Sequence, residues 1–356
     1  MATRVRSHSK INLGLAIGPV RADGFHGLAT LYQTLALYDW VTVEARRAEP
    51  GARSRITLKT NHAQVPADAR NTAWKMVQRA LQRMGVAAEV TVDIQKALPV
   101  EGGMGAGSAN AAAAFLGLER ELGCALPEPA RLEMAGEVGS DVPLFLIGGT
   151  VLGLGRGEQV QAMADLPATP CVVALPGVGV STPRAFRDWD ERQAVDRPQT
   201  GPELTSDPQP DRLGELSLAY ASVLGSGFGD RMEHAPDTSG IVRGRTPEKP
   251  QDGNTRNDLA ENSLLALVRT GIENDFEQVV FPQYPLLREI KHELMGDSEE
   301  AAVYAALSGS GSALFGLYRS GQDAQAAQQR VRSSGCKAIL TETLPRQEYW
   351  RTMFAE

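Results

Sequence analysis

Residues 99–112 have the sequence PVEGGMGAGSANAA, a glycine-rich loop that runs into an alanine-rich segment. Residues 90–94 before the loop have the pattern of a strand, and residues 111–122 after it have high helical propensity. Glycines let backbone N–H groups approach an anion closely, and the first turn of a helix offers free N–H groups and the positive end of its dipole. This order of strand, loop and helix therefore predicts a phosphate-binding site.

The loop differs from two common nucleotide-binding glycine motifs. No Lys follows the glycines, as G-x-x-x-x-G-K-[ST] requires, and the ribose-binding context of a dinucleotide fold is absent. Ser108 and Asn110 would add side-chain donors at the start of the helix. The structural alternative is a mobile surface loop capped by Ser108, and the adjoining S-x-N-A-A run argues against it.

The length, charge and composition of the chain limit the classes of protein to which it can belong. A chain of 356 residues exceeds what one core usually organises, so we expect two domains with a cleft, at 1–165 and 170–356. The net charge of −7 excludes a basic field for nucleic acid, and no apolar run approaches the roughly 20 residues that cross a bilayer. With no signal peptide at the N-terminus, we expect a cytoplasmic protein whose cysteines, Cys124, Cys171 and Cys336, are buried thiols.

Residues 10–17 alternate strictly between apolar and other residues, which predicts a strand. Its polar face carries Lys10 and Asn12, which therefore project together. Other strands are expected at 31–44, 90–94, 151–154, 172–175, 302–318 with a turn at 308–312, and 338–341, and helices at 71–84, 111–122, 128–137, 264–268, from 285, and 324–332. The elements mix without a regular βαβ repeat, so we expect an α+β fold with a flexible insertion at about 190–256.

Five motifs in order resemble those of the GHMP kinase superfamily. The loop at 99–112 is similar to its ATP-binding signature, and SKIN at 9–12 resembles the first-strand A-K-[IL]-N. GSDVP at 139–143 resembles G-[AS]-D-V-P, NDFE at 274–277 resembles N-D-[LF]-E, and LSGSG at 307–311 resembles the late M/L-S/T-G-S-G turn. The resemblance covers most of the chain outside the insertion.

The resemblance implies a two-domain GHMP kinase fold, with an N-terminal domain like domain 2 of ribosomal protein S5 and a ferredoxin-like C-terminal domain. It implies ATP and Mg²⁺ as cofactors; the sequence has no clustered carboxylates, which leaves the metal ligands unknown and Ser108 a weak candidate. The residues implied in ATP binding are Pro99, Gly102, Gly103, Met104, Gly105, Ala106, Gly107, Ser108, Ala109 and Asn110.

Phosphoryl transfer to an alcohol needs a positioned hydroxyl, a place for its proton and stabilisation of negative charge. By resemblance, Asp141 is the candidate general base, and Lys10 would pair with it and with the reacting hydroxyl. The alternatives are an exposed lysine at a strand end and an aspartate that caps the helix before Pro143.

The segment RADGFH at 21–26 is similar to R-x-D-G-[YF]-H-x-L-x-T of the diphosphocytidyl-methylerythritol kinases, a branch of this superfamily. The resemblance implies that His26 hydrogen-bonds a cytosine ring, that Phe25 and Phe186 stack on it, and that Asn12 touches substrate hydroxyls or phosphates. Core packing is the alternative for both phenylalanines, and solvent exposure for His26.

Four residues depart from the family pattern. Ala106 and Ala109 replace a glycine and a serine of the signature, and are tolerable where φ is negative. Glu101 puts a carboxylate beside the anion site, and Phe25 replaces a more frequent tyrosine. Their effect on ATP affinity does not follow from the sequence.

We therefore predict an enzyme that uses ATP to phosphorylate the 2-hydroxyl of a cytidine diphosphate substrate, cytidylated methylerythritol, in non-mevalonate isoprenoid synthesis. One alternative is another GHMP kinase, acting on mevalonate, phosphomevalonate, homoserine or a sugar. A second is a catalytically silent nucleotide-binding protein of the same fold. The sequence predicts neither a nucleic acid nor a membrane partner, and does not distinguish a monomer from a dimer.

Overall fold

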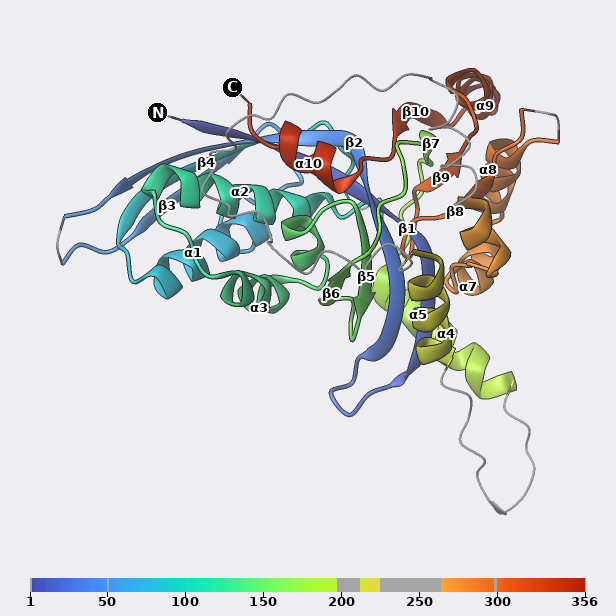
Figure 1. The fold of residues 1–356 in the computed structure, drawn as a ribbon, viewed down its shortest axis with the longest axis horizontal. Coiled ribbons are helices and arrows are strands. Elements are labelled where there is room, and N and C mark those ends of the chain that lie inside the picture. Colours follow the sequence, from blue (N-terminus) through green and yellow to red (C-terminus); the bar gives the residue numbers. More distant parts are fainter. Residues whose placement is uncertain are drawn as a thin grey trace, which may run out of the picture.

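The computed structural model describes residues 2–49, 51–100, 102–196, 212–224, 264–297 and 300–355. These residues form two β-sheets, each with helices gathered on one side (Figure 1). Helices segregated to one side of largely antiparallel sheets define the α+β class, so the predicted fold class is confirmed.

The larger sheet has the strand order β3-β4-β2-β5-β6, and β1 pairs with β2. All neighbours are antiparallel except β3 and β4. Its strands are β1 (Thr3–Val20), β2 (His26–Arg47), β3 (Arg55–Thr60), β4 (Ala88–Gln95), β5 (Thr150–Leu154) and β6 (Gln159–Ala162), and its helices are α1 (Thr72–Met84), α2 (Ala106–Leu122) and α3 (Glu128–Val138). Asn71 caps α1 as expected, because its side chain accepts a hydrogen bond from the N–H of Ala73.

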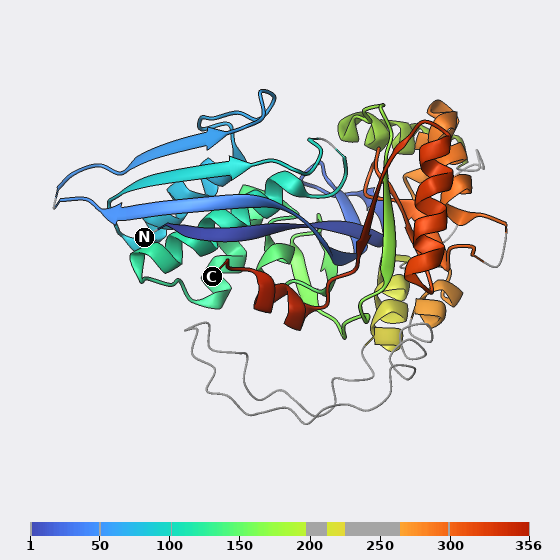
Figure 2. The same cartoon turned by 90° about the horizontal axis from the view of Figure 1, so that it is seen from above.

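The smaller sheet has the order β10-β7-β9-β8 with every pair antiparallel. Its strands are β7 (Pro170–Leu175), β8 (Tyr304–Leu307), β9 (Leu314–Leu317) and β10 (Lys337–Glu342), and its helices are α7 (Glu277–Gln283), α8 (Pro285–Met295) and α9 (Gly321–Ser333). The helices lie on the side facing away from the larger sheet (Figure 2). The predicted helix at Pro285 and the strand interrupted by a glycine turn are both present.

The β1–β2 hairpin joins the two layers. Along β1, Val5 packs in the core under α1 and α2, Ile11 and Leu13 in a core between the sheets, and Leu15 and Ile17 in the core of the smaller sheet. The predicted strand at 10–17 is therefore confirmed but too short, because both ends continue into other cores. Lys10 and Asn12 lie in the middle of this element.

The end of the chain returns to the larger sheet, which the sequence did not predict. After β10, the helix α10 (Arg346–Thr352) places Tyr349 in the core under α1 and α2, and a β-bridge joins Phe354 to Val5. The connection between β6 and β7 contains the predicted boundary at residues 165–170. That boundary stays a prediction, because the last segment of the chain packs on the other side of it.

The predicted insertion at about 190–256 lies largely outside the described residues. The described part includes the end of α4 (Thr182–Asp196) and the helix α5 (Arg212–Leu224). A Cβ at Gly14 would lie 2.4 Å from the Tyr220 hydroxyl, and one at Gly18 would lie 2.6 Å from a Leu213 methyl group. The helix α5 therefore packs on the β1–β2 hairpin.

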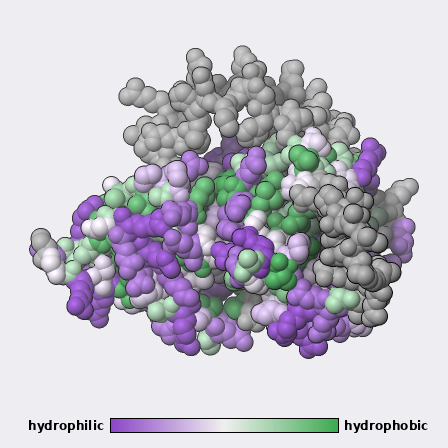
Figure 3. All heavy atoms as spheres, turned by 90° about the horizontal axis from the view of Figure 1, so that it is seen from below, coloured by the Kyte–Doolittle hydropathy of each residue, from purple (hydrophilic) through white to green (hydrophobic). Residues whose placement is uncertain are grey.

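The surface carries large hydrophilic areas, as Figure 3 shows for one face. Among the described residues, the exposed large hydrophobic side chains are Val20, Phe25, Leu218, Leu286 and Leu340. No helix in the described ranges is long and apolar enough to cross a membrane. The three cysteines are free, as expected, but only Cys171 is buried, so the prediction of burial is wrong for Cys124 and Cys336.

Hydrogen bonds to two glycine carbonyls connect the loop at 102–107 to the late turn at 308–313. The Ser308 hydroxyl donates to the carbonyl of Gly103 at 3.0 Å, and the N–H of Ala313 donates to the carbonyl of Gly102 at 3.3 Å. Gly103 has a left-handed φ of +73°, and a Cβ there would lie 2.1 Å from the Ser308 carbonyl oxygen. Only glycine therefore permits this approach.

The NDFE motif at 274–277 connects the same turn to the first strand. The side chain of Asn274 donates to the carbonyls of Leu307 and Gly309 at 2.8 and 2.7 Å. Asp275 accepts a hydrogen bond from the N–H of Ile17 at 2.8 Å, and Glu277 accepts one from the N–H of Leu307, also at 2.8 Å. The motif therefore fixes the late turn relative to β1.

We predict that Gly103→Ala lowers the melting temperature, because a Cβ would meet a backbone oxygen in an unfavourable φ region, at a cost of about 1–3 kcal/mol. Gly107→Ala, in the first turn of α2, is the control, because the nearest heavy atom, Thr72 Oγ1, would lie 3.6 Å from the Cβ. Scanning fluorimetry of the two variants without nucleotide measures the difference. An unchanged melting temperature for Gly103→Ala would contradict the prediction.

Candidate active site

Lys10 and Asp141 meet in space although they lie far apart in the sequence. The Lys10 ammonium is 3.3 Å from Asp141 Oδ2, and the lysine side chain is 4% exposed against 30% for the aspartate. The alternative of an exposed lysine at a strand end is thus wrong. The cap alternative for Asp141 is also wrong, because no side chain caps the 3₁₀ turn η1 (Pro143–Leu146) that follows it.

Asn12 holds the Lys10 ammonium from the other side. Its Oδ1 accepts a hydrogen bond from Lys10 Nζ at 2.7 Å, and its Nδ2 donates to the Thr30 hydroxyl at 2.8 Å. Thr30 in turn donates to the carbonyl of Gly14 at 2.9 Å. This chain of donors fixes the amide orientation, so Asn12 presents an oxygen to the lysine; its contact with substrate stays a prediction.

The first turn of α2 has neither a side-chain cap nor an acidic residue that would compete with a bound anion. Its N-cap residue is Gly105, with a left-handed φ of 67°, no side chain caps the helix, and its first turn contains no acidic residue. The surface-loop alternative required Ser108 as the cap and is therefore wrong. Ala106 and Ala109 lie within this helix, where φ is negative, so both departures from the family pattern are sterically tolerable.

The loop residues alternate in exposure around this helix start. Gly103, Gly105, Gly107 and Ser108 reach the surface at least in part, as does Pro99, whereas Gly102, Met104, Ala106, Ala109 and Asn110 are buried. Backbone N–H groups at an uncapped helix start can bind an anion. Glu101 lies outside the described residues.

Asn110 serves a different purpose from the one predicted. Its side chain donates to the Ser7 hydroxyl at 2.8 Å and to Asp39 Oδ2 at 3.0 Å, and the residue is 3% exposed. Both amide hydrogens are therefore used inside the protein. The prediction that its side chain donates to phosphate is wrong, because Asp39 and Ser7, which no local motif revealed, compete for it.

Three segments surround the Lys10 ammonium. The N–H of Lys10 donates to the carbonyl of Met104 at 3.0 Å, which attaches the loop to β1. A Cβ at Gly105 would lie 3.1 Å from the Lys10 side chain, and one at Gly309 would lie 3.7 Å from its Nζ. A buried cation, a partly exposed carboxylate and a free helix start therefore adjoin, which is the set of groups that phosphoryl transfer requires.

Two of the residues predicted to bind a base, Phe25 and His26, lie at the tip of the β1–β2 hairpin, and Phe186 lies on α4. Phe25 is 54% exposed, with the Arg156 guanidinium 5.0 Å from its ring centre, so it is not a core residue. His26 is buried and stacks on Phe186 with ring centres 5.0 Å apart and planes 9° apart. The exposure alternative is wrong for His26. The core-packing alternative holds for Phe186, which packs against the core of the smaller sheet with its ring centre 4.9 Å from that of the buried Phe276.

Both nitrogens of His26 have partners within the chain. Nδ1 is 2.9 Å from the carbonyl of Gly18, and Nε2 is 3.2 Å from Asp190, which is 48% exposed. A base edge could therefore reach Nε2 only by replacing Asp190. The predicted hydrogen bond from His26 to cytosine stays a prediction.

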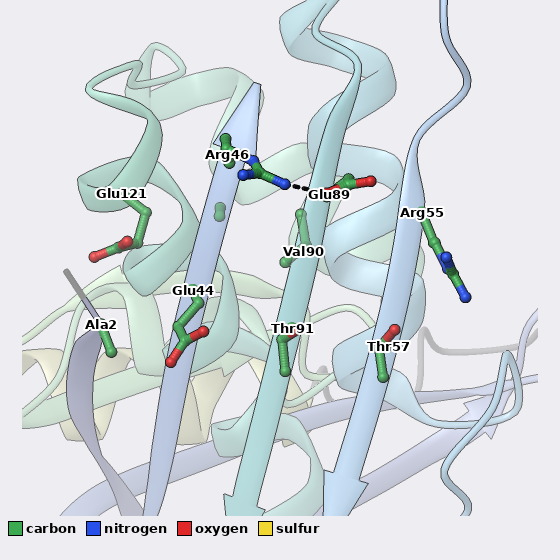
Figure 4. A pocket seen from close by; sticks show the side chains of 10 residues that line it. Ala2, Glu44, Arg46, Arg55, Thr57, Glu89, Val90, Thr91 and Glu121 are labelled. Carbon is green, nitrogen blue, oxygen red and sulfur yellow. Dashed lines mark hydrogen bonds and ion pairs between the residues drawn. The ribbon is translucent and has the colours of Figure 1, made fainter. Parts of the chain in front are cut away.

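A separate concavity of about 660 Å³ lies at the far end of the larger sheet (Figure 4). Its rim carries both signs of charge, including an Arg46–Glu89 ion pair of 2.7 Å. Glu44 on its wall lies ten residues along β2 from Thr34, the partner of Lys10 in the sheet. The concavity is thus remote from the Lys10 and Asp141 pair.

The described residues contain no group of three or more His, Cys, Asp or Glu side chains placed to hold a metal ion. Mg²⁺ in phosphoryl-transfer sites is commonly held by one or two protein oxygens together with substrate phosphates and water. The Ser108 hydroxyl is an oxygen donor of this kind beside the helix start. The donor set fits a metal that arrives with the nucleotide.

Family models match two parts of the chain: the GHMP kinases N terminal domain at residues 71–149 and the GHMP kinases C terminal domain at 256–337. A 4-diphosphocytidyl-2-C-methyl-D-erythritol kinase of Solibacter usitatus (strain Ellin6076) is 31% identical over 319 residues, 88% of this chain and 81% of that protein. The kinase of the same name from Moorella thermoacetica is 30% identical over 95% of this chain and 98% of its own.

Solved structures agree with the sequence matches. A crystal structure of 4-(cytidine 5'-diphospho)-2C-methyl-D-erythritol kinase is similar with a TM-score of 0.63 and 26% identity, covering 96% of this chain and 98% of that one. A homoserine kinase from Cytophaga hutchinsonii has the same TM-score at 18% identity, covering 98% and 96%, and shows the fold alone. The chain therefore belongs to the GHMP kinase family, in its branch of 4-diphosphocytidyl-2-C-methyl-D-erythritol kinases.

Proposed function

We propose that this protein transfers the γ-phosphoryl group of ATP to the 2-hydroxyl of 4-diphosphocytidyl-2-C-methyl-D-erythritol, with Asp141 as the general base. The observation that carries the proposal is the buried Lys10 ammonium, 3.3 Å from the partly exposed Asp141 carboxylate and adjoining the uncapped start of α2. This is a phosphotransferase reaction of isoprenoid precursor synthesis.

The chemistry follows from these groups. Asp141 accepts the proton of the substrate hydroxyl while the hydroxyl oxygen forms a bond to the γ-phosphorus. The bond between that phosphorus and the β–γ bridging oxygen breaks, and ADP is released. Lys10 stays protonated, orients the carboxylate and stabilises negative charge as it develops on the transferred group. The N–H groups of Ala106, Gly107 and Ser108 would hold the nucleotide phosphates. Mg²⁺, when bound, would neutralise phosphate charge, and Ser108 is the residue that would contact it.

The hairpin tip would bind the cytosine. The ring of Phe25 is exposed and able to stack on a flat base. Phe186 and His26, which stack on each other, form a second aromatic surface. Displacement of Asp190 from His26 would free a nitrogen for the base edge. Substrate recognition would thus lie at the tip of one hairpin, and phosphoryl transfer in its middle.

The substrate assignment predicts a clear preference among acceptors. At matched ATP, ADP release with cytidylated methylerythritol should exceed that with mevalonate or homoserine by at least about 10³ in kcat/KM, because only the first has a base for the hairpin tip. A coupled ADP assay measures it. Preferential use of mevalonate or homoserine would overturn the substrate assignment, and ATP binding without ADP release would favour the catalytically silent alternative.

We expect Asp141→Asn to lower kcat by about 10²–10⁴-fold, because the amide cannot accept the proton. ATP affinity, measured by calorimetry, should stay within about threefold, since the helix start is unchanged. Glu158→Gln is the control, because it neutralises a neighbouring carboxylate on the β5–β6 turn. Near-normal turnover of Asp141→Asn would remove Asp141 from the role of base.

We expect His26→Ala to raise the KM of the cytidylated substrate at least about tenfold, which corresponds to the loss of about one charge-assisted or stacked contact. The KM of ATP should stay within about twofold. His292→Ala, an exposed histidine of α8, is the matched control. Equal rises in both KM values for His26→Ala would show that the base binds elsewhere.

A further inference from the structure

Tyr32 contacts the proposed base directly, although none of the sequence motifs contains it as a functional residue. It lies on β2, where it pairs with Asn12 of β1 and with Val151 of β5. Its hydroxyl donates to Asp141 Oδ1 at 3.0 Å, and the residue is 2% exposed. The Lys10 ammonium lies 5.5 Å from the centre of its ring.

Two glycines lie against the Tyr32 side chain. A Cβ at Gly153 would lie 2.6 Å from the Tyr32 ring, and a Cβ at Gly157 would lie 2.4 Å from its hydroxyl oxygen. Gly157 also has a φ of +99°, a conformation that side chains other than glycine rarely adopt. The two glycines of the β5–β6 hairpin therefore leave room for the ring and fix its hydroxyl toward Asp141.

The hydroxyl acts only as a donor. Burial raises the pKa of Tyr32 well above its ordinary value, and the negative charges of Asp141 and Glu158 raise it further. The phenol therefore keeps its proton across the working pH range and takes no part in proton transfer. Its single hydrogen is committed to Asp141 Oδ1.

The two oxygens of Asp141 consequently differ. Oδ1 accepts the hydrogen bond from Tyr32, while Oδ2 faces the ammonium of Lys10 at 3.3 Å. A carboxylate can rotate about its side-chain bonds, and a donor on one oxygen limits that rotation. Lys10 itself adjoins the helix start, since a Cβ at Gly105 would lie 3.1 Å from its side chain, so Oδ2 is the oxygen beside the group that adjoins the helix start.

We propose that Tyr32 is a positioning residue for phosphoryl transfer, which holds Asp141 so that Oδ2, shared with Lys10, meets the substrate hydroxyl. The inference rests on the proposed role of Asp141 as base. It assigns different tasks to the two carboxylate oxygens: Oδ1 is anchored, and Oδ2 receives the proton.

Tyr32→Phe in the full-length enzyme tests this, because it removes one hydroxyl and keeps the ring. We expect kcat to fall about tenfold, with both KM values within about twofold, as for one lost hydrogen bond to a charged group. The acidic limb of the kcat–pH profile should move to higher pH than in the wild type, because a carboxylate that loses a hydrogen-bond donor binds a proton more readily. A change in packing alone would not move this limb.

Tyr318→Phe is the matched control. Its hydroxyl is also buried and donates to a backbone carbonyl, that of Leu294, at 2.8 Å in the core of the smaller sheet. The same atom is removed, but away from the site, so kcat and its pH profile should stay at wild-type values. A wild-type kcat in Tyr32→Phe, or a reduced kcat with an unmoved acidic limb, would overturn the proposal.

A second measurement does not depend on turnover. The ¹³C resonance of the Asp141 carboxyl, identified by its absence in Asp141→Asn, is titrated in the wild type and in Tyr32→Phe. We expect the midpoint to lie at higher pH in the variant than in the wild type, for the same reason. Identical titration midpoints in the wild type and in Tyr32→Phe would overturn the positioning role, whichever acceptor the enzyme uses. Failure of the acceptor assay alone would overturn only the proposed substrate.

Discussion

The pairing of β1 with β2 is the constraint on which both layers depend. Because β1 is buried on both faces along most of its length, it contributes to three cores and cannot shift without exposing apolar side chains in each. Register shifts beside Lys10 and between Asn12 and Gly14 show where bulges adjust the direction of its side chains. The strand thus delivers an ammonium group to the junction of the two sheets.

A buried ammonium is costly unless it is paired, since the penalty for removing one charge from water is several kcal/mol. Asn12 Oδ1 and Asp141 Oδ2 meet this need from two different elements, at 2.7 and 3.3 Å. The pair sits at the edge of the core, with the lysine 4% and the aspartate 30% exposed. Burial therefore fixes the cation, while the carboxylate stays accessible to a substrate.

Local signals predicted local structure well. The helix at 71–84 follows from a capping asparagine and apolar periodicity, and α1 begins one residue after that cap. The helix α2 begins at Ala106 instead of the predicted residue 111, because Gly105 in a left-handed conformation starts it directly from the loop, although G-A-G-S has weak helical propensity. The strand β3 and the helix α10 were missed, because both are short and depend on packing against distant segments. The pairing of Lys10 with Asp141 was predicted, but only through the resemblance of ordered motifs.

Two aspartates show what the motifs could not specify. Asp39, which is fully buried, accepts hydrogen bonds from Lys96 Nζ, from the N–H groups of Ala97 and Leu98, and from Asn110, so each of its oxygens has two donors. A carboxylate has about four acceptor positions, so Asp39 has none left for chemistry and instead fixes both ends of the glycine loop. Asp141 has one donor, Tyr32, on Oδ1 and one cation, Lys10, beside Oδ2. The number of filled acceptor positions therefore separates the structural carboxylate from the reactive one, and this number depends on residues 71 and 109 positions apart in the sequence.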